Sequence, residues 1–286
     1  MRILITGANG MLGRALAERL AAGHTLLLWG RDEADLADEA AVRDASRGIQ
    51  FDAIVHAAAF TEVDRCESDY GAALRGNRDT VRHVAALAKE RGARFVTVST
   101  DYVFDGTKGT PYLEEDPTAP VNAYGRSKLE GERAALESGA AALVVRTSWL
   151  FGPGGKNFVD TIAGKLERGE PLEVVDDQRG SPTYTRDLAH GIARLLGRGT
   201  TGVVHVTNRG ETTWYGFAVA IAKYIGSSTP ITPVTTDRFP RPAARPRYSV
   251  LSGERFASVT GEPMPPWESA LHHYLAGRSA APGAAA

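Results

Sequence analysis

The chain begins Met1-Arg-Ile-Leu-Ile-Thr-Gly7-Ala-Asn-Gly10-Met-Leu-Gly13, an apolar run followed by three glycines at intervals of three residues. A segment with a helical period comes next and ends at Gly23. In a dinucleotide-binding fold the first such glycine makes a tight turn, the second lets the backbone approach a pyrophosphate, and the third allows close helix packing. Ordinary strand-turn-helix corners can share this spacing, but its place directly after an N-terminal strand favours nucleotide binding in a parallel α/β fold.

The stretch Tyr124-Gly-Arg-Ser-Lys128 carries a second pattern. On a helix, a spacing of four residues puts Tyr124 and Lys128 on the same face, about one turn apart. Tyrosine with its ordinary pKa of about 10 is a poor proton donor at neutral pH, and a nearby ammonium lowers that pKa. We therefore expect Lys128 to lower the pKa of Tyr124. The pair alone is common on helix surfaces, and the upstream glycine loop favours the catalytic interpretation.

Five further apolar runs predict the other strands of a parallel sheet, and the first of them is expected to be buried. They are Thr25–Trp29, Asp52–Ala57, Arg94–Thr100, Ala142–Ser148 and Val203–Val206. Catalytic groups of open parallel sheets gather at the carboxyl ends of the strands. Ser99 and Thr100 end one of these runs, and Thr100 lies 24 residues before Tyr124.

Helical periodicity predicts one continuous helix from about Asp64 to Arg91, with Asn77 inside it. A second helix is predicted to start near Thr212, with Trp214, Phe217, Ala218, Ile221 and Tyr224 or Ile225 as its apolar stripe. Between them, Trp149 follows the run Ala142–Ser148 and could pack on a sugar or nicotinamide face, or simply belong to the core. The arginine-rich segment Arg238–Arg247 could face a pyrophosphate or be a solvated linker.

The end of the run Thr25–Trp29 bears on the choice of cofactor. An acidic residue there binds the ribose 2'-hydroxyl of NAD, whereas an arginine can hold the 2'-phosphate of NADP. The sequence continues Gly30-Arg31-Asp32, which favours NADPH and leaves NADH possible. Arg31 could equally be a solvated loop charge.

With the glycine loop in front and Tyr124/Lys128 behind, the chain resembles the extended short-chain dehydrogenase/reductase superfamily, and within it the dTDP-4-dehydrorhamnose reductase family. The runs that carry the resemblance occur in that family's order over nearly the whole chain. They are Ala57–Asp64, Ser99–Gly106, Asn122–Glu132, Arg146–Trp149, Gly154–Phe158 and Val174–Thr183.

The fold expected from these patterns and this resemblance is a Rossmann-type doubly wound parallel sheet with a smaller C-terminal substrate-binding lobe. Beyond Phe151 the alternation of strands and helices loosens. We expect the dinucleotide-binding domain to span 1–150, with 183–207 returning to it. The lobe would comprise 151–182 and 208–278. The Ala-, Gly- and Pro-rich tail 279–286 is expected to be disordered.

The resemblance implies that NAD(P)H reduces the C4 ketone of a dTDP-linked 4-keto-6-deoxyhexose, giving dTDP-L-rhamnose or a related deoxysugar. Tyr124 would donate the proton, Lys128 would also hold the nicotinamide ribose, and Thr100 would hydrogen-bond the substrate oxygen. The implied substrate residues are Val63, Thr100, Asp101, Tyr102, Tyr124 and Trp149. The implied cofactor residues are Gly7, Gly10, Met11, Leu12, Gly13, Arg31, Asp35, Leu36, Ala58, Ala59, Ser99, Tyr124 and Lys128.

Composition excludes several other classes of function. The 286 residues carry a formal net charge of −1, which gives no electrostatic case for nucleic acid or a membrane surface. The single cysteine, Cys66, and the lack of a hydrophobic leader point to a reducing cytoplasm. No local metal-binding spacing is present. Some family members share magnesium at a dimer contact through a glutamate after the glycine loop, where this chain has Arg14-Ala15, so no metal is expected and a homodimer stays open.

Two other interpretations stay open. A sugar-nucleotide epimerase or dehydratase shares the superfamily, but a dehydratase would carry Asp-Glu after the strand-end threonine, where Asp101 is followed by Tyr102. A non-catalytic regulatory subunit is the other, because the beta subunit of methionine adenosyltransferase resembles the same family.

Overall fold

The apolar run after Met1 forms β1, which lies inside a parallel six-stranded sheet ordered β10-β5-β4-β3-β1-β2. In this computed structural model, which describes residues 1–280, the strand order reverses between β1 and β3, where open α/β sheets bind ligands. The strands are β1 (Arg2–Thr6), β2 (Thr25–Trp29), β3 (Ala53–His56), β4 (Arg94–Thr100), β5 (Ala141–Thr147) and β10 (Gly202–His205). The predicted runs are thus confirmed as parallel strands.

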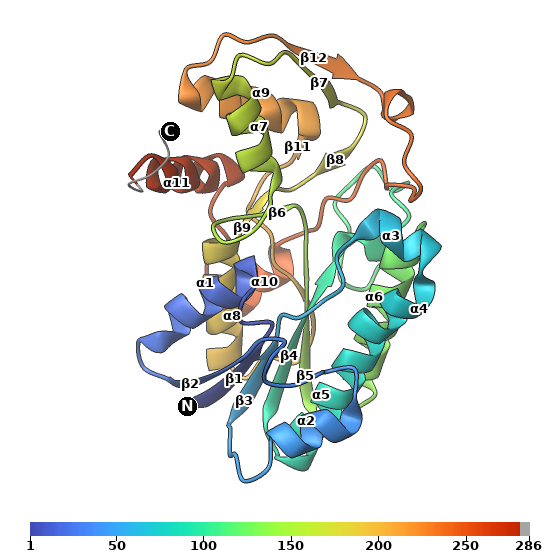
Figure 1. Cartoon of the computed structure of the whole chain (residues 1–286), viewed down its shortest axis with the longest axis vertical. Helices are drawn as coiled ribbons and strands as arrows, with labels where there is room; N and C mark the ends of the chain where they lie inside the picture. The colour runs from blue at the N-terminus through green and yellow to red at the C-terminus, as the bar shows by residue number, and fades with distance from the viewer. Residues whose placement is uncertain (281–286) are drawn as a thin grey trace.

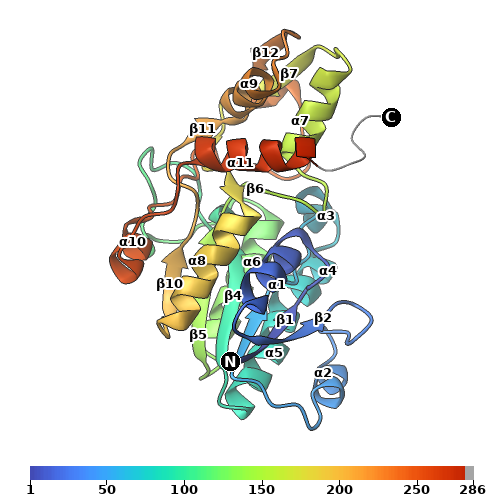
Figure 2. The same cartoon turned by 90° about the vertical axis from the view of Figure 1, so that its left-hand side faces the viewer.

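Helices cover both faces of this sheet (Figures 1 and 2). Alternate residues of β1 divide between the layers, with Ile3 and Ile5 in one core and Leu4 in the other. One layer contains α1 (Met11–Ala21), α8 (Thr185–Gly197) and α10 (Glu254–Thr260). The other contains α2 (Glu39–Ala45), α5 (Thr80–Glu90) and α6 (Ala123–Leu136). The prediction that Thr25–Trp29 is buried is wrong for part of the strand, because β2 forms the sheet edge and Leu28 is 47% exposed.

The single helix predicted from Asp64 to Arg91 is also wrong. The chain instead forms α3 (Val63–Ser68), α4 (Tyr70–Leu74), the π-helical turn η1 (Arg75–Asp79) and α5. Asp69 starts a new helix because its carboxylate accepts the backbone N–H of Ala72. Within η1 the buried Asn77 side chain bonds both the N–H and the C=O of Phe60, and it also reaches Ser127 Oγ of α6. These long-range bonds favour the wider turn over a regular helix.

The C-terminal lobe stands at one end of the sheet, at the top of Figure 1. Its core combines aliphatic with aromatic side chains, and the aromatic ones include Phe151, Phe217 and Tyr274. The helices are α7 (Phe158–Glu167), α9 (Trp214–Ile225) and α11 (Trp267–Ala280). Short pairs of strands complete it, namely β6 (Leu150–Phe151) with β9 (Thr183–Tyr184), β7 (Leu172–Val175) with β12 (Ile231–Val234), and β8 (Arg179–Gly180) with β11 (Thr212–Thr213).

The helix predicted near Thr212 begins at Trp214, after Thr213 Oγ1 accepts the N–H of Gly216. Its predicted stripe faces the lobe core, with Phe217, Ala218 and Ile221 fully buried. Between β9 and β11 the chain returns to the main sheet as α8 and β10. α11 includes Ser279 and Ala280, the first residues of the tail predicted to be disordered, and 281–286 lie outside the described part of the chain.

Candidate active site

Two adjoining cavities follow the carboxyl ends of the central strands. The first, which we call the glycine-loop cavity, has a volume of about 490 Å³ and lies at the switch point between β1 and β3. It is lined by seven of the residues predicted to bind a cofactor, Gly7, Gly10, Arg31, Asp35, Leu36, Ala58 and Ala59. The second, the β4 cavity, has a volume of about 380 Å³ and shares Gly10, Ala57 and Ala59 with the first.

The β4 cavity collects the remaining cofactor candidates and the predicted catalytic residues. Its lining includes Met11, Leu12, Gly13, Ser99, Thr100, Asp101, Tyr124, Lys128 and Trp149. The structure therefore brings the glycine loop and the Tyr124/Lys128 pair, more than a hundred residues apart in the sequence, to one continuous groove. Of the other predicted substrate residues, Tyr102 lines a third cavity, and Val63 lies at the start of α3.

The glycine loop leaves no room for side chains where it meets its neighbours. Gly7 has φ of +72°, and a Cβ there would lie 2.6 Å from Ala58 N. A Cβ on Gly13 would lie 2.1 Å from the carbonyl oxygen of Gly7. The first turn of α1 carries no acidic residue, so the helix N-terminus presents unopposed N–H groups to the cavity. This cradle fits the pyrophosphate of a dinucleotide.

Two buried hydroxyls in the β4 cavity support the same conclusion. Ser99 Oγ and Thr147 Oγ1 are buried and have no protein partner among the described residues. Their strands are neighbours, because β4 pairs with β5. Buried polar atoms usually have a hydrogen-bond partner, so these hydroxyls fit the polar part of a bound cofactor.

Tyr124 and Lys128 lie on α6, which Asn122 starts by accepting the N–H of Gly125. Gly125 packs the helix against the segment after β4, since a Cβ there would lie 2.1 Å from Tyr102 O. Lys128 Nζ donates to the backbone oxygen of Val98 at 2.7 Å. The rings of Tyr124 and Tyr102 meet edge to face at 5.9 Å. The predicted helical spacing of the pair is thus confirmed.

The predicted lowering of the Tyr124 pKa is contradicted. Burial of the hydroxyl raises the pKa of Tyr124, the charge of Asp101 raises it further, and a hydrogen bond with Thr100 opposes this rise. Burial also lowers the pKa of Lys128 to about 8, against the opposing charge of Glu132. Desolvation therefore outweighs any attraction between ammonium and phenolate, and Tyr124 is a protonated phenol at neutral pH.

Asp101 determines how Thr100 is oriented. The Thr100 hydroxyl donates to Asp101 Oδ1 at 2.9 Å, and Ser249 Oγ donates to Asp101 Oδ2 at 2.5 Å. Burial raises the pKa of Asp101 to about 6, although both hydroxyls stabilise its charge. While Asp101 is ionised, the single proton of Thr100 points to Asp101, so Thr100 presents an oxygen lone pair to its other neighbours.

The ring of Trp149 is packed against two neighbours. One face stacks on Trp214, with ring centroids 3.5 Å apart and planes within 5°. The ring also lies close to Gly180, where a Cβ would lie 2.5 Å from Trp149 Cε2. Trp149 also has a φ of +48°, a strained value for a residue with a side chain. Trp149 lines the β4 cavity with a ring that already stacks on Trp214, so its contacts favour the packing role among the two predicted alternatives.

A third cavity of about 820 Å³, the lobe cavity, lies between the sheet body and the C-terminal lobe. Its lining includes Tyr102, Phe158, Lys165, Trp214, Arg241 and Arg245. Asp64 binds the last two, since its carboxylate lies 2.5 Å from Arg245 Nη1 and 3.8 Å from Arg241 Nη1. Two arginines of the predicted strip thus face a cavity, whereas Arg238 pairs with Glu173.

Sequence reasoning missed several residues around these cavities. Trp214 was assigned only to a helix stripe, although it also lines the lobe cavity. Ser249 lies 148 residues from Asp101, and no local pattern connects the two. Glu132, whose charge raises the pKa of Lys128, belongs to the run Asn122–Glu132, and no pattern in that run indicates this effect.

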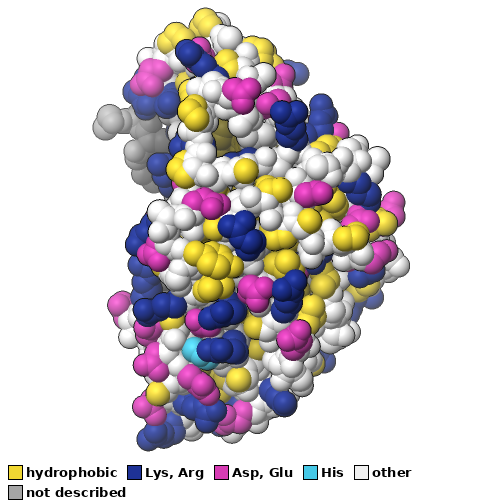
Figure 3. Space-filling view, turned by 90° about the vertical axis from the view of Figure 1, so that its right-hand side faces the viewer, with side chains coloured by type: hydrophobic (Ala, Val, Ile, Leu, Met, Phe, Trp, Pro, Cys, Tyr) yellow, Lys and Arg dark blue, Asp and Glu magenta, His cyan; other side chains and the backbone are white. Residues whose placement is uncertain are grey.

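Residues 1–280 contain neither a cluster of metal-binding side chains nor a membrane-spanning helix. Within 1–280, no group of three or more His, Cys, Asp or Glu side chains is placed to hold a metal ion. Arg14, which follows the glycine loop, donates its Nε proton to Asn9 O at 3.0 Å. No helix in this part of the chain is long and apolar enough to cross a membrane. On the face in Figure 3, acidic and basic side chains are interspersed.

A family model described as the RmlD substrate binding domain matches residues 1–279. The chain belongs to this family. It is 43% identical over 288 residues to a dTDP-4-dehydrorhamnose reductase from Burkholderia thailandensis, covering 95% of this chain and 97% of that protein. The predicted resemblance and fold class are thus confirmed for this member of the RmlD family.

Two solved structures show how closely the fold is shared. A dTDP-4-dehydrorhamnose reductase from Clostridium acetobutylicum superposes with a TM-score of 0.94 at 37% identity, covering 98% of this chain and 100% of that one. The enzyme from Bacillus anthracis, in complex with NADP, gives a TM-score of 0.93 at 37% identity, covering 96% and 99%. Both cover the sheet body and the C-terminal lobe of this family member.

Proposed function

We propose that the protein reduces the C4 ketone of a dTDP-linked 4-keto-6-deoxyhexose with NADPH, or with NADH, forming dTDP-L-rhamnose or a related deoxysugar. The observation that carries this proposal is the continuous groove that joins the glycine loop to Thr100, Tyr124 and Lys128. The names of the relatives supply the substrate class. NADP in the Bacillus anthracis structure supports the cofactor.

The cofactor would lie along the two adjoining cavities, where it supplies a hydride to the ketone carbon. Gly7, Gly10 and Gly13 admit its pyrophosphate, and Arg31 at the end of β2 holds the 2'-phosphate of NADPH. Ser99, Thr147 and Lys128 bind its nicotinamide half with hydroxyl and ammonium groups. Because Arg31 is an exposed residue, the affinity it adds stays moderate and NADH remains a usable cofactor.

Tyr124 gives its phenolic proton to the C4 oxygen as negative charge develops there. The raised pKa keeps the Tyr124 hydroxyl protonated at neutral pH, so its proton is available before the reaction begins. The ammonium of Lys128 then stabilises the phenolate that remains. The hydrogen bond between Thr100 and Tyr124 lowers the pKa of Tyr124 and so favours the phenolate that remains after the transfer.

The lobe cavity would hold the nucleotide part of the substrate. Arg241, Arg245 and Lys165 offer positive charge to a diphosphate, and Phe158, Trp214 and Tyr102 offer aromatic surface. Without substrate, Asp64 forms an ion pair with Arg245. The phosphate oxygens of the substrate would replace the Asp64 carboxylate as the partner of Arg245. We assign 1–150 and 183–207 to cofactor binding, and 151–182 and 208–278 to the substrate lobe, in a cytoplasmic enzyme that could act as a homodimer.

The test is oxidation of NADPH by the purified full-length protein supplied with dTDP-4-dehydrorhamnose. We expect one equivalent of NADPH consumed for each dTDP-deoxysugar formed, as measured by absorbance and mass spectrometry. Binding of NADPH without turnover of this or a related dTDP-4-keto-6-deoxysugar would contradict the proposal and would favour a regulatory subunit. Conversion of the sugar without net NADPH use would favour an epimerase or dehydratase.

A further inference from the structure

The face of α6 that carries Tyr124 and Lys128 continues with a third ionisable residue, Glu132. It lies one turn beyond Lys128, and its side chain is 3% exposed. Its carboxylate receives two N–H groups from Arg146 of β5, Nε at 2.9 Å and Nη2 at 2.7 Å. A buried ion pair often adds no stability over apolar residues of similar volume. This pair, beside the candidate active site, therefore invites a functional explanation.

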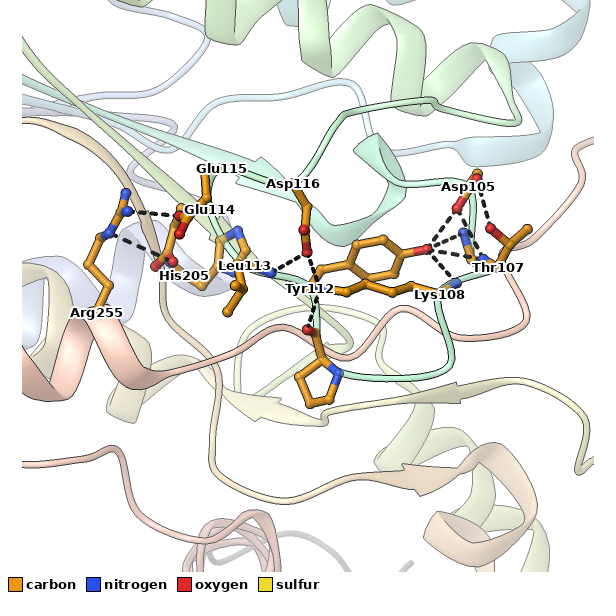
Figure 4. Close-up of polar contacts among 12 residues, drawn as sticks. Asp105, Thr107, Lys108, Tyr112, Leu113, Glu114, Glu115, Asp116, His205 and Arg255 are labelled. Atoms are coloured by element: carbon orange, nitrogen blue, oxygen red, sulfur yellow. Dashed lines mark hydrogen bonds and ion pairs between the residues drawn. The ribbon is translucent and has the colours of Figure 1, made fainter.

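On the side away from Glu132, uncharged groups hold the Arg146 guanidinium in place and do not neutralise its positive charge. Its Nη1 donates to the backbone oxygen of Glu114 at 3.3 Å, and its Cζ lies 5.1 Å from the ring centroid of Phe104. The carboxylate of Glu114 points elsewhere, accepting the N–H of His205 and facing Arg255, as Figure 4 shows. Glu132 is thus the carboxylate paired with Arg146, and Arg146 holds it in one orientation.

Lys128 is surrounded by groups that are mostly neutral. From β3, the buried His56 has a pKa lowered to about 3 by burial and by the charge of Lys128, so it is uncharged at neutral pH. From α6, Tyr124 is a neutral phenol. Asp101, which follows β4 and lines the same cavity, directs its carboxylate to the Thr100 and Ser249 hydroxyls. Glu132 is the group whose charge favours the protonated form of Lys128.

We propose that Glu132 is a positioning residue for the reaction, which keeps the Lys128 side chain protonated in the cofactor groove while Arg146 fixes the Glu132 carboxylate. This inference rests on the proposed function, because it adds Glu132 to the same proton-transfer apparatus. The lysine needs such a carboxylate because burial alone favours the neutral amine.

The first experiment compares the pH dependence of kcat/KM in the wild type and in Glu132→Gln. Loss of the carboxylate lowers the Lys128 pKa, so the alkaline limb of the profile should move to lower pH by about one unit. The matched control is Glu130→Gln, on the same helix, because Glu130 pairs with Arg133 on the exposed side and should leave the limb in place.

The double variant Glu132→Gln/Arg146→Met separates charge from folding. In Glu132→Gln the buried Arg146 guanidinium has lost its carboxylate partner. The double variant removes this unpaired charge, so we expect its melting temperature to lie above that of the single variant. The alkaline limb should stay at the lower pH, because the carboxylate is still missing. A double variant whose alkaline limb lies at the wild-type pH would overturn the proposal and leave the ion pair with a purely structural role.

A binding measurement keeps this inference distinct from the proposed function. Fluorescence titration of NADPH across the same pH range needs no substrate, and in Glu132→Gln the affinity should weaken at a lower pH than in the wild type. Absence of turnover by the wild type would refute the proposed reductase while this titration still tests Glu132. Identical pH dependence of NADPH affinity in all variants would refute the role of Glu132.

Discussion

The glycine-loop cavity and the lobe cavity are built in different ways. The first contains a backbone site at the glycine loop, because a Cβ on Gly7 or on the adjoining Gly13 would collide with main-chain atoms. The second is made of long side chains, including Arg241 and Arg245, which are already paired with Asp64. The backbone site can change little at Gly7 and Gly13, because a Cβ at either position would collide with neighbouring backbone. The side-chain site can change more, because a ligand has only to exchange one set of partners for another.

The largest expected effect comes from breaking the backbone site with Gly13→Ala. The new Cβ would lie 2.1 Å from the Gly7 oxygen, so α1 must move away from the loop. We expect the free energy of unfolding to fall by about 3 kcal/mol and NADPH affinity to fall by roughly 100-fold. Calorimetry and fluorescence titration measure these. The control is Gly197→Ala, where the Cβ would meet no atom within 4 Å; equal behaviour of the two variants would rule out the steric argument.

Tyr124→Phe tests the proposed proton transfer in the β4 cavity, next to the backbone site. It removes the proton donor and keeps the ring that meets Tyr102 edge to face. Turnover should fall by roughly 100-fold or more, while NADPH affinity stays within about twofold of the wild type. Steady-state kinetics measures the turnover, and a fluorescence titration measures the NADPH affinity. Turnover near the wild-type rate would end the assignment of Tyr124 as proton donor.

Asp101→Asn tests the cost of a buried charge between the two sites. The pKa of Asp101 is raised from 3.8 to about 6, so its ionisation destabilises the fold progressively as pH rises from about 4 to 6 and fully above that. The asparagine variant should be more stable than the wild type by about 2 kcal/mol at pH 7, and this advantage should vanish at pH 4. Denaturant unfolding at both pH values measures it. An advantage independent of pH would show that Asp101 ionisation is not the cause.

Arg31→Ala probes the basic side chain beyond the end of β2 that lines the glycine-loop cavity. The KM for NADPH should rise by about tenfold, because a charge-assisted contact with the 2'-phosphate is lost. The KM for NADH, which lacks that phosphate, should change little. Equal increases for the two cofactors would exclude phosphate recognition by Arg31.

The smallest effect is expected from Asp64→Asn, which loosens the side-chain site. The pKa of Asp64 is lowered mainly by its hydrogen bond from Arg245, so the two groups attract each other in the absence of substrate. Releasing Arg245 should lower the KM for the dTDP sugar by about threefold and leave NADPH affinity unchanged. The control is Glu62→Gln, an exposed carboxylate paired with Arg65. A raised KM would mean that Asp64 itself binds the substrate.

The same contrast explains what the sequence could predict. Short sequence spacings predicted two parts of the site. The spacing of three between Gly7, Gly10 and Gly13 and the spacing of four between Tyr124 and Lys128 each span about one turn of the backbone, so local backbone geometry places these residues. The break at Asp69 and Asn77 depends on bonds to Phe60 and Ser127, and periodicity does not detect them. The pKa of Tyr124 is raised, whereas the sequence predicted a lowered value, because the burial that raises it depends on residues far away in the sequence. The packing of Trp149 against Trp214 and Gly180 likewise depends on distant parts of the chain.

The division of the cores along the chain sets an order for folding during synthesis. The fully buried residues of the core beneath α2, α5 and α6 run from Leu4 to Val144, so this layer can consolidate when half of the chain has left the ribosome. The opposite layer needs Phe256 and Met264, and the lobe needs Leu275. A nascent chain that stops before α11 would therefore expose Phe151 and Phe217 to chaperones and proteases, and the lobe forms last.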